Sequence, residues 1–375
     1  MPRVPGTKTG RNAELGLLAF AMVIVAIFGA TAEANQLDEV TPTFWTAAAL
    51  LSILFLGLHV VVRFFAPYAD PVLLPTVALI NGLGVAFLRR LNIQDALELN
   101  QEPPGVFGGT AGRQLMWTLI ALVLAAVLLI VVRDHKVVSR YAYTLGLAGI
   151  ILVMLPAVLP ASISERNGAR LWVQIGSFSF QPGEFAKICL VSFFAYYLVR
   201  KREVLSLASR RFLGIDFPRG RDLGPVVTVW LLSLLVLVFE KDLGTALLYF
   251  GLFVVTLYVA TERASWLIIG LLLFFGGVYV AYLLGASVGG PFANFYDRAE
   301  VWLNPFSQEE YDRIGGSYQL VQSLLGFGTG GLFGTGPGAG SPDFVPEYET
   351  DMIYSGLGEE IGLFGLTALL VFYLL

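Results

Sequence analysis

The sequence predicts an all-α integral membrane protein with about ten transmembrane helices and a large ordered extracytoplasmic loop. Of its 375 residues, 56% are hydrophobic and only 14% are charged. Soluble domains carry about 25% charged residues, so this deficit and the long apolar runs indicate helices that lipid surrounds. The mean hydropathy of +0.72 agrees with this assignment. The net charge of −4 excludes little, because in a membrane protein the distribution of charge matters more than its sum.

A bilayer core about 30 Å thick takes about 20 apolar residues of helix, and this length sets each predicted span. The first span, 13–32, follows basic residues and precedes an acidic stretch instead of a small-residue cleavage site. No cleavable signal peptide is therefore expected. The next four apolar runs predict the spans 43–65, 71–88, 113–133 and 141–160.

The second half of the chain carries five more predicted spans. The sixth, 183–200, starts at a Pro-Gly pair, and proline fits the first turn of a helix. The short stretch "EKDLG" separates the seventh, 224–240, from the eighth, 243–260, which predicts a tight hairpin. The ninth is 265–284. The tenth, 352–375, reaches the chain end without a polar flank, as expected of a chain that stops before its natural C-terminus.

The distribution of Lys and Arg predicts the orientation. With a cytoplasmic N-terminus, the inner segments hold fifteen of these residues and the outer segments hold eight. This bias follows the positive-inside rule and places the basic cluster 200–221 inside. The longest segment between spans, 285–351, then lies outside, and we name it the long loop. It is acidic and rich in Tyr, Trp, Phe and Gly, which favours an ordered, partly re-entrant loop.

Cysteine and histidine are too few for most metal centres. Cys189 is the single cysteine, which excludes an intramolecular disulfide and a multi-cysteine zinc or iron–sulfur site. His59 and His135 lie far apart in the sequence, which disfavours a histidine-based site. We expect no nucleic-acid partner.

Residues 326–340 read "GFGTGGLFGTGPGAG", and we name them the glycine-rich segment. Gly326, Gly328 and Gly331 match G-x-G-x-x-G, but a dinucleotide site needs a strand before the glycines and a helix after them. A P-loop needs Gly-Lys-Ser/Thr, and no lysine follows here. We therefore expect no nucleotide. The alternatives are close backbone packing at membrane depth and a flexible floor for a substrate cavity.

The block "NGARLWVQIGSFSFQPGEFAK", residues 167–187, is the first that suggests chemistry. Arg170 and Trp172 lie just outside the fifth span, where Trp is by default an interfacial anchor. Glu184 and Lys187 stand at i, i+3 and share a helix face. Ionisable residues at this depth are costly and face a cavity or a partner. The pair therefore either serves a substrate or holds helices together.

Further polar clusters lie near the predicted outer face. Asp242 follows the seventh span, where it marks a functional site or a simple helix cap. In the long loop, Asp312 stands close to Tyr318 and the polar residues that follow it. Glu347 and Asp351 precede the last span.

The last span begins with two adjacent acidic residues, Glu359 and Glu360, of which we expect one to face the protein interior. Together the clusters predict an outer-face site for an amphiphile with an anionic headgroup, such as a lipid-linked diphosphate sugar. Arginine would bind the diphosphate, and a carboxylate would transfer a proton. The residues assigned to substrate binding are Arg170, Trp172, Gln181, Glu184, Lys187, Asp242, Tyr318, Gln319, Gln322, Ser323, Glu347 and Asp351.

These motifs resemble those of the SEDS family (shape, elongation, division and sporulation), the group of RodA and FtsW. Residues 167–187 resemble the family's Gly-x-Arg-x-Trp…Phe-Gln-Pro-Ser-Glu…Lys block, with Gly183 where Ser is usual. "EKDLGT" resembles its Pro-Asp-Leu-Gly-Thr block, with Lys241 in place of Pro. "WLNPF…DRIGGSYQLVQSLL", the glycine-rich segment and "PEYETDMIYSGLGEEIGLFG" resemble its long outer loop and the helix after it.

The resemblance covers about residue 71 to the end, and it is most similar to actinobacterial RodA-type members. It divides the chain into four parts. These are two extra N-terminal helices in 1–70, eight core helices of the family of which seven lie in 71–284, the catalytic loop 285–351, and the last helix present, 352–375. The family's final two helices are absent from this chain.

The resemblance implies a peptidoglycan glycosyltransferase that polymerises lipid II at the outer face of the bacterial cytoplasmic membrane. Counting back from Tyr318 assigns the family's catalytic aspartate to Asp312. Asp312 would act as general base in an inverting reaction, and burial under the glycine-rich segment would raise its pKa. Three positions depart from the family pattern: Arg313 replaces Pro, Ser317 replaces Gly, and Glu349 replaces His.

The resemblance also implies a class B penicillin-binding protein as partner, membrane lipids as surroundings, and a divalent cation, Mg²⁺ or Mn²⁺, with Asp312 as one candidate ligand. Asp312 could instead cap a helix or bind metal without acting as base. Two other functions stay open. The chain could be a flippase or transporter of the lipid-linked precursor, or a non-catalytic scaffold that activates the penicillin-binding protein.

Overall fold

The structure is a computed structural model, and most of the residues that it describes are helical. It describes residues 8–132, 134, 136–166, 169–175, 178–206, 210–212, 215–217, 228, 231, 243–289 and 292–374. Eight helices within these residues are long and apolar enough to cross a bilayer, and the strands are at most three residues long. The predicted class of all-α multi-pass membrane protein is confirmed. The chain forms two compact units, Met1–Arg133 with Ala293–Leu375, and Asp134–Phe292.

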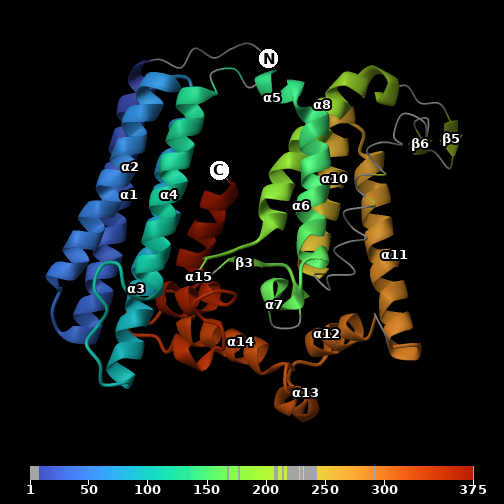
Figure 1. Cartoon of the computed structure of the whole chain (residues 1–375). Coiled ribbons are helices and arrows are strands. Elements are labelled where there is room, and N and C mark those ends of the chain that lie inside the picture. Colours follow the sequence, from blue (N-terminus) through green and yellow to red (C-terminus); the bar gives the residue numbers. More distant parts are fainter. Residues whose placement is uncertain are drawn as a thin grey trace. The chain divides into compact units, whose positions relative to one another are not determined.

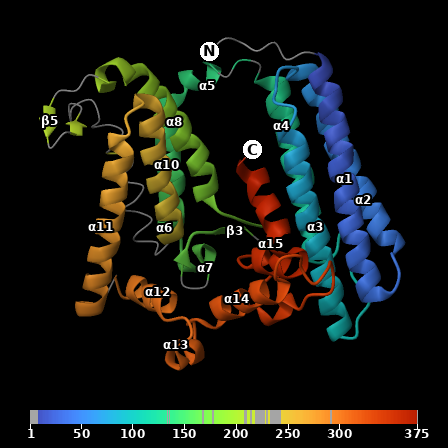
Figure 2. The same ribbon diagram turned by 180° about the vertical axis from the view of Figure 1, so that it is seen from behind.

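The first unit is a bundle of long helices joined to the long loop. In Figure 1 and Figure 2, α1, α2, α3 and α4 run alongside one another, and contacts join α15 to α3. Its elements are α1 (Lys8–Leu37), α2 (Pro42–Phe65), α3 (Leu73–Glu98), α4 (Gly109–Val131), α12 (Ala293–Leu303), α13 (Gln308–Asp312), α14 (Tyr318–Gly330), the 3₁₀ turn η2 (Pro342–Phe344) and α15 (Ile353–Leu374).

Small residues let the first three helices approach closely. A Cβ at Gly82 of α3 would lie 2.6 Å from Val25 of α1, and one at Gly29 of α1 would lie 2.5 Å from the ring of Phe44 on α2. Packing of this kind is typical of helix contacts in membranes, where the hydrophobic effect drives no association. The two extra N-terminal helices therefore share one core with α3 and α15.

Within its described residues, the second unit contains four long or moderately long helices and three short hairpins. Its core is aromatic: Phe193, Phe194 and Tyr197 of one helix pack with Tyr249 and Phe253 of another. The elements are α5 (Lys136–Arg140), α6 (Ala142–Val158), α7 (Ala161–Ser164), β1 (Glu165–Arg166), β2 (Ala169–Arg170), β3 (Val173–Ile175), β4 (Phe178–Phe180), α8 (Pro182–Ser206), β5 (Arg210–Phe212), β6 (Ile215–Phe217), α10 (Leu243–Thr261) and α11 (Ser265–Ser287).

Nine of the ten predicted spans lie on described helices, and the seventh, 224–240, lies outside the described residues apart from positions 228 and 231. Several helices are longer than their predicted spans, α1 and α3 among them. The α1 helix extends beyond 13–32, and α3 continues ten residues past position 88. Four charged residues in these extensions are buried in ion pairs, so they continue the helices instead of flanking them: Arg11, Glu33, Arg89 and Arg90.

One such pairing lies near the start of α1. Arg11 pairs with Glu14, and the other carboxylate oxygen of Glu14 lies 2.6 Å from Nδ1 of His59 on α2. All three side chains are buried. Buried charges persist when they are paired, which explains why the helix tolerates them.

Candidate functional site

The long loop is ordered, as the sequence predicts, and its middle carries Asp312 at the end of α13. Ser307 caps this short helix by accepting a hydrogen bond from the Glu310 backbone N–H at 3.3 Å. The side-chain amide of Gln308 donates to Asp312 Oδ2 at 2.6 Å. The Asp312 side chain is otherwise exposed, so the expected burial beneath the glycine-rich segment is wrong.

The turn after Asp312 is held by many local contacts. Arg313 Nη2 lies 2.8 Å from Glu310 Oε2, and its backbone φ of −70° is the value that proline also adopts. Ser317 is fully buried, and its hydroxyl donates to the carbonyl oxygen of Pro305 at 2.5 Å. A Cβ at Gly316 would overlap the Glu310 carbonyl oxygen. Two of the three positions that depart from the family pattern, 313 and 317, therefore take part in fixing this turn.

The first residues of α14 gather around Tyr311 of α13. The Tyr318 ring lies 5.3 Å from the Tyr311 ring, and the Gln322 amide donates to the Tyr311 hydroxyl at 3.1 Å. Gln319 reaches the Pro346 carbonyl oxygen at 2.9 Å, whereas Ser323 is buried. Tyr318 and Gln322 thus pack on α13, and within the part of the chain that the structure describes none of these four side chains hydrogen-bonds the Asp312 carboxylate.

The turn before α15 carries the next assigned residues, Glu347 and Asp351, both exposed. Glu347 has a positive φ of 57°, and its carbonyl oxygen accepts from the backbone of Thr350 and of Met352, both at 3.1 Å. Its side chain accepts from the Thr350 hydroxyl at 3.1 Å. A non-glycine residue with positive φ is uncommon and is held in place by such surroundings.

The end of α3 supports this turn with residues that the sequence analysis does not single out. The Tyr348 hydroxyl donates to Asp95 Oδ1 at 2.6 Å, and the Gln94 amide donates to Asp343 at 2.5 Å. Burial, followed by the hydrogen bond and negative charge of Asp95, raises the pKa of the Tyr348 phenol. Tyr348 therefore remains a neutral donor at alkaline pH. No periodic signal marks Gln94 or Asp95, because α3 here extends past its apolar run.

Glu359 and Glu360 are both buried, so the expectation that one of them faces the interior is too narrow. Arg90 of α3 and the glycine-rich segment cover them, and α15 breaks just after them at Gly362, where φ is 67° and ψ is −177°. Glu360 Oε1 lies 2.6 Å from Arg90 Nε, and the Arg90 guanidinium also donates to the Gly340 carbonyl oxygen. The Glu359 side chain lies against the glycine-rich segment.

The glycine-rich segment packs closely on neighbouring backbone at Gly330, Gly334 and Gly338, which favours the close backbone packing that we considered over a flexible floor. Its first part belongs to α14, and its later part pairs with the broken region of α15. Thr335 N–H donates to the Glu359 carbonyl at 2.9 Å, and Leu363 N–H donates to the Gly331 carbonyl at 2.9 Å. Gly326 and Gly328 lie inside a helix, not after a strand, so the geometry lacks the strand–glycine–helix order of a dinucleotide site.

The assigned residues of the second unit lie around the start of α8. Lys187 Nζ lies 2.7 Å from both Glu184 carboxylate oxygens, which confirms that the two share a helix face. Arg170 lies 3.4 Å from Glu165 within the β1–β2 hairpin, and both are exposed. The Gln181 carbonyl accepts from Glu184 N–H at 3.1 Å.

For two of the assigned residues the structure gives little detail. The Trp172 side chain is half-buried, and Asp242 lies outside the described residues. The convergence of the polar clusters of both units on one site stays a prediction. The four-part division of the chain stays a prediction too.

The family model of FtsW, RodA and SpoVE, described as cell cycle protein, matches residues 71–375. The chain belongs to this family. The resemblance drawn from the motifs is thereby confirmed, and both α1 and α2 lie before the matched residues. We name α1 and α2 the accessory helix pair.

Relatives in the family align along nearly the whole chain. The peptidoglycan glycosyltransferase RodA of Mycobacterium tuberculosis (strain H37Rv) is 45% identical over 370 residues, covering 98% of this chain and 75% of the relative. The RodA of Mycobacterium leprae is 43% identical over 369 residues, with the same coverage. A solved chain from a study of a peptidoglycan synthase complex is 23% identical with a TM-score of 0.45, covering 88% of this chain and 74% of that chain.

The tight packing of the glycine-rich segment yields a prediction. We expect Gly334→Ala to destabilise the protein by about 2 kcal/mol or more, because φ is +83° and the added Cβ would overlap the Glu360 carbonyl oxygen. Gly328→Ala, where a Cβ would have no atom within 4 Å, should stabilise α14 by about 0.5–1 kcal/mol. Thermal unfolding of the purified variants checks this, and equal midpoints for the two would contradict the packing.

Proposed function

We propose that the chain is an inverting peptidoglycan glycosyltransferase that polymerises lipid II into glycan strands. The observation that carries this proposal is the 45% identity with mycobacterial RodA glycosyltransferases over 98% of the chain. The structure supports it with an exposed carboxylate, Asp312, on a turn whose backbone is fixed on both sides.

In the proposed reaction, Asp312 acts as general base. It accepts the proton of the acceptor sugar's 4-hydroxyl while that oxygen attacks the anomeric carbon of the lipid-linked donor. A new glycosidic C–O bond forms, the C–O bond to the diphosphate breaks, and undecaprenyl diphosphate leaves. Attack opposite to the leaving group inverts the anomeric carbon. The amide of Gln308 holds Asp312 Oδ2, so the remaining oxygen Oδ1 is the one that faces the acceptor.

Cationic side chains of the second unit complete the proposal. Arg170 and Lys187 offset the charge that develops on the leaving diphosphate. Lys187 is held by Glu184, so it binds the diphosphate by exchanging or sharing that partner. Trp172, Gln181 and Asp242 of the same unit, with Tyr318, Gln319, Gln322, Ser323, Glu347 and Asp351 of the first, are proposed to line the headgroup site.

A lipid tail has a suitable place in the first unit. A cavity of about 680 Å³ lies along α3, α4 and α15, with Ile80, Leu88 and Phe372 among its apolar lining and Glu349 and Thr350 at its long-loop end. A prenyl chain in this cavity leaves its diphosphate next to the long loop. The tail therefore directs the headgroup toward the part of the chain that carries Asp312.

A divalent cation, Mg²⁺ or Mn²⁺, remains part of the proposal with a limited role. Among the described residues, no three Asp, Glu, His or Cys side chains are grouped to hold a metal ion. Asp312 alone does not form a protein-built centre, so we assign no reaction step to a metal. Mg²⁺ commonly binds through one or two carboxylates and substrate phosphates, and the diphosphate of lipid II supplies such oxygens.

We also propose the topology and the partner. The N-terminus lies in the cytoplasm and the long loop lies outside, supported by the excess of Lys and Arg in the segments that are then cytoplasmic. The bacterial cytoplasmic membrane is the compartment in which lipid II meets such a loop. A class B penicillin-binding protein, which crosslinks glycan strands, is the proposed partner, and we propose neither a nucleotide nor a nucleic acid as ligand.

The experiment that tests the function separates polymerisation from transport. The chain and its class B partner are reconstituted in liposomes that carry lipid II labelled on the sugar. We expect labelled glycan polymer that a muramidase digests. Intact label that crosses the bilayer without forming polymer would instead establish a flippase, and neither product would support a scaffold.

A further inference from the structure

The accessory helix pair contacts the glycine-rich segment directly. Asn35 Nδ2 on the last turn of α1 donates to the Pro337 carbonyl oxygen at 2.7 Å. Ala32, one turn earlier, is buried, and a Cβ at Gly338 would lie 2.6 Å from its carbonyl oxygen. Gly338 has a φ of +79°, so this close approach and the backbone conformation both require glycine. The segment thus rests on α1.

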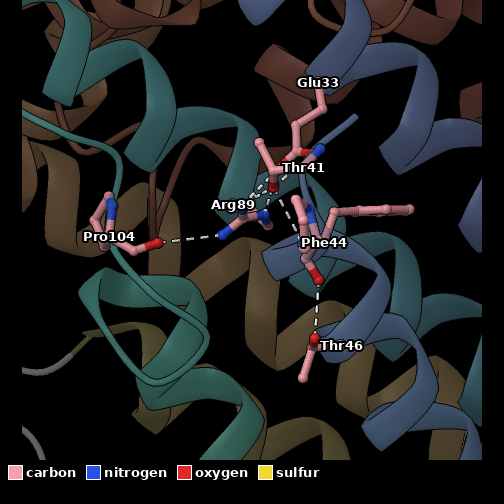
Figure 3. A network of polar contacts seen from close by, with 7 residues as sticks. Glu33, Thr41, Phe44, Thr46, Arg89 and Pro104 are labelled. Atoms are coloured by element: carbon pink, nitrogen blue, oxygen red, sulfur yellow. Dashed lines mark hydrogen bonds and ion pairs between the residues drawn. The ribbon is translucent and has the colours of Figure 1, made fainter. Parts of the chain in front are cut away.

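A buried network ties the same end of α1 to α3. Figure 3 shows Arg89 of α3 between Glu33, Thr41 and the Pro104 carbonyl. Glu33 Oε1 lies 2.5 Å from Arg89 Nη2, and Glu33 Oε2 accepts from the Thr41 backbone N–H at 2.8 Å. Thr41 is the N-cap of α2. The Glu33 carboxylate therefore joins both accessory helices to α3. Because it is desolvated, it is stabilised only when Arg89 and Thr41 lie in positions that allow both contacts.

The next residue of α3, Arg90, joins the other side. Its guanidinium binds Glu360 of α15 and the Gly340 carbonyl oxygen. Two adjacent arginines thus hold different elements, Arg89 the accessory helix pair and Arg90 the glycine-rich segment with α15. Gly336 N–H also donates to the Glu360 carbonyl at 3.0 Å. The segment lies between α1 and α15 and is held from both.

The α14 helix links the glycine-rich segment to the turn that holds the proposed general base. At its end, Gly330 packs so closely on Gly358 that a Cβ would overlap the Gly358 carbonyl oxygen. At its start lies the turn that holds Asp312. Its 13 residues span roughly 20 Å at 1.5 Å per residue, so a small tilt at the glycine end displaces the other end.

We infer that the accessory helix pair positions the long loop for catalysis, with Asn35 and Ala32 setting the place of the glycine-rich segment. This inference rests on the proposed function, and it assigns a role to helices that lie outside the matched family model. Asn35 and Ala32 are positioning residues: they act on Asp312 through the segment and α14. A displacement of about 1 Å at reacting groups can lower a rate about a hundredfold.

The test uses Asn35→Ala and Ala32→Val in the whole chain reconstituted with its partner. Thr31→Ala, at an exposed position on the same helix one turn before Asn35, is the matched control. The first readout is hydrogen exchange of the backbone amides of Gly334, Thr335, Gly336 and Gly338. We expect at least tenfold faster exchange in Asn35→Ala, with exchange in the middle of α3 unchanged. Thr31→Ala should exchange like the parent protein.

The second readout is steady-state polymerisation with lipid II. We expect kcat to fall about tenfold in Asn35→Ala while the KM for lipid II stays within twofold, because the turn that carries the base moves, whereas the tail cavity along α3, α4 and α15 stays in place. Unchanged exchange, or faster exchange with unchanged kcat, would overturn the inference. If Ala32→Val fails to fold, Asn35→Ala decides alone. A parent protein without polymerase activity would reject the proposed function, whereas an active parent with an equally active Asn35→Ala rejects this inference alone.

Discussion

Asp312→Asn is expected to reduce lipid II polymerisation by about 10²- to 10⁴-fold, the range that general acid–base groups contribute. Asparagine keeps the size of the side chain and can still meet Gln308, but it cannot accept the proton of the acceptor hydroxyl. Asp312 is exposed, so its replacement should leave the thermal unfolding midpoint nearly unchanged. Polymer yield per mole of folded protein, measured with labelled lipid II, checks the expectation.

Glu309→Gln is the matched control for this variant. Glu309 lies on the same short helix, is equally exposed and loses the same charge. We expect it to retain activity within a few-fold. A polymer yield of Asp312→Asn equal to that of Glu309→Gln would show that Asp312 is a cap or an electrostatic residue and not the base.

Arg90→Ala is expected to destabilise the protein by about 3–5 kcal/mol, since it leaves the buried carboxyl group of Glu360 without its partner. Both side chains are almost fully inaccessible, and Arg90 Nε lies 2.6 Å from Glu360 Oε1. The variant also removes the donor to the Gly340 carbonyl, so the glycine-rich segment loses one of the hydrogen bonds that hold it. Thermal unfolding in detergent, followed by tryptophan fluorescence, measures the shift.

Arg113→Ala on α4 provides the comparison, because Arg113 is exposed. Its effect should stay within about 0.5 kcal/mol, as for most surface substitutions. Glu360→Gln adds a second test: it keeps the shape of the side chain and leaves Arg90 without a counter-charge, so it should destabilise nearly as much as Arg90→Ala. A Glu360→Gln protein as stable as the parent would mean that the pair stabilises the fold through its packing and not through its charge.

The sequence predicts the spans well because a long apolar run has few alternatives to a membrane helix. It predicts the ends of α1 and α3 poorly for one physical reason. Arg89 and Arg90 look like polar flanks in the sequence, yet their partners, Glu33 and Glu360, lie 56 and 270 positions away along the chain. A pairing across such separations leaves no periodic signal, so burial of the four charges emerges from the structure alone.

In the candidate site, too, the sequence predicts local features but not the contacts between segments. The motif around Tyr318 identifies Asp312, and the order of the loop follows from its aromatic content. The surroundings of Asp312 depend on contacts between segments, such as Tyr311 with Gln322 and Ser317 with Pro305, which spacing does not reveal. The glycine-rich segment looks permissive in sequence, whereas at Gly330, Gly334 and Gly338 its packing leaves no room for a Cβ.

The break in α15 at Gly362 has a consequence for how this helix enters the bilayer. A break at mid-helix frees backbone groups that lipid cannot satisfy. Here Leu363 N–H and Phe364 N–H donate to the carbonyls of Gly331 and Leu332, at 2.9 and 3.2 Å. We therefore expect that α15 is not inserted as an independent span. The acceptor carbonyls of Gly331 and Leu332 precede α15 in the chain. They have therefore left the ribosome before the N–H groups of Leu363 and Phe364 that bind them.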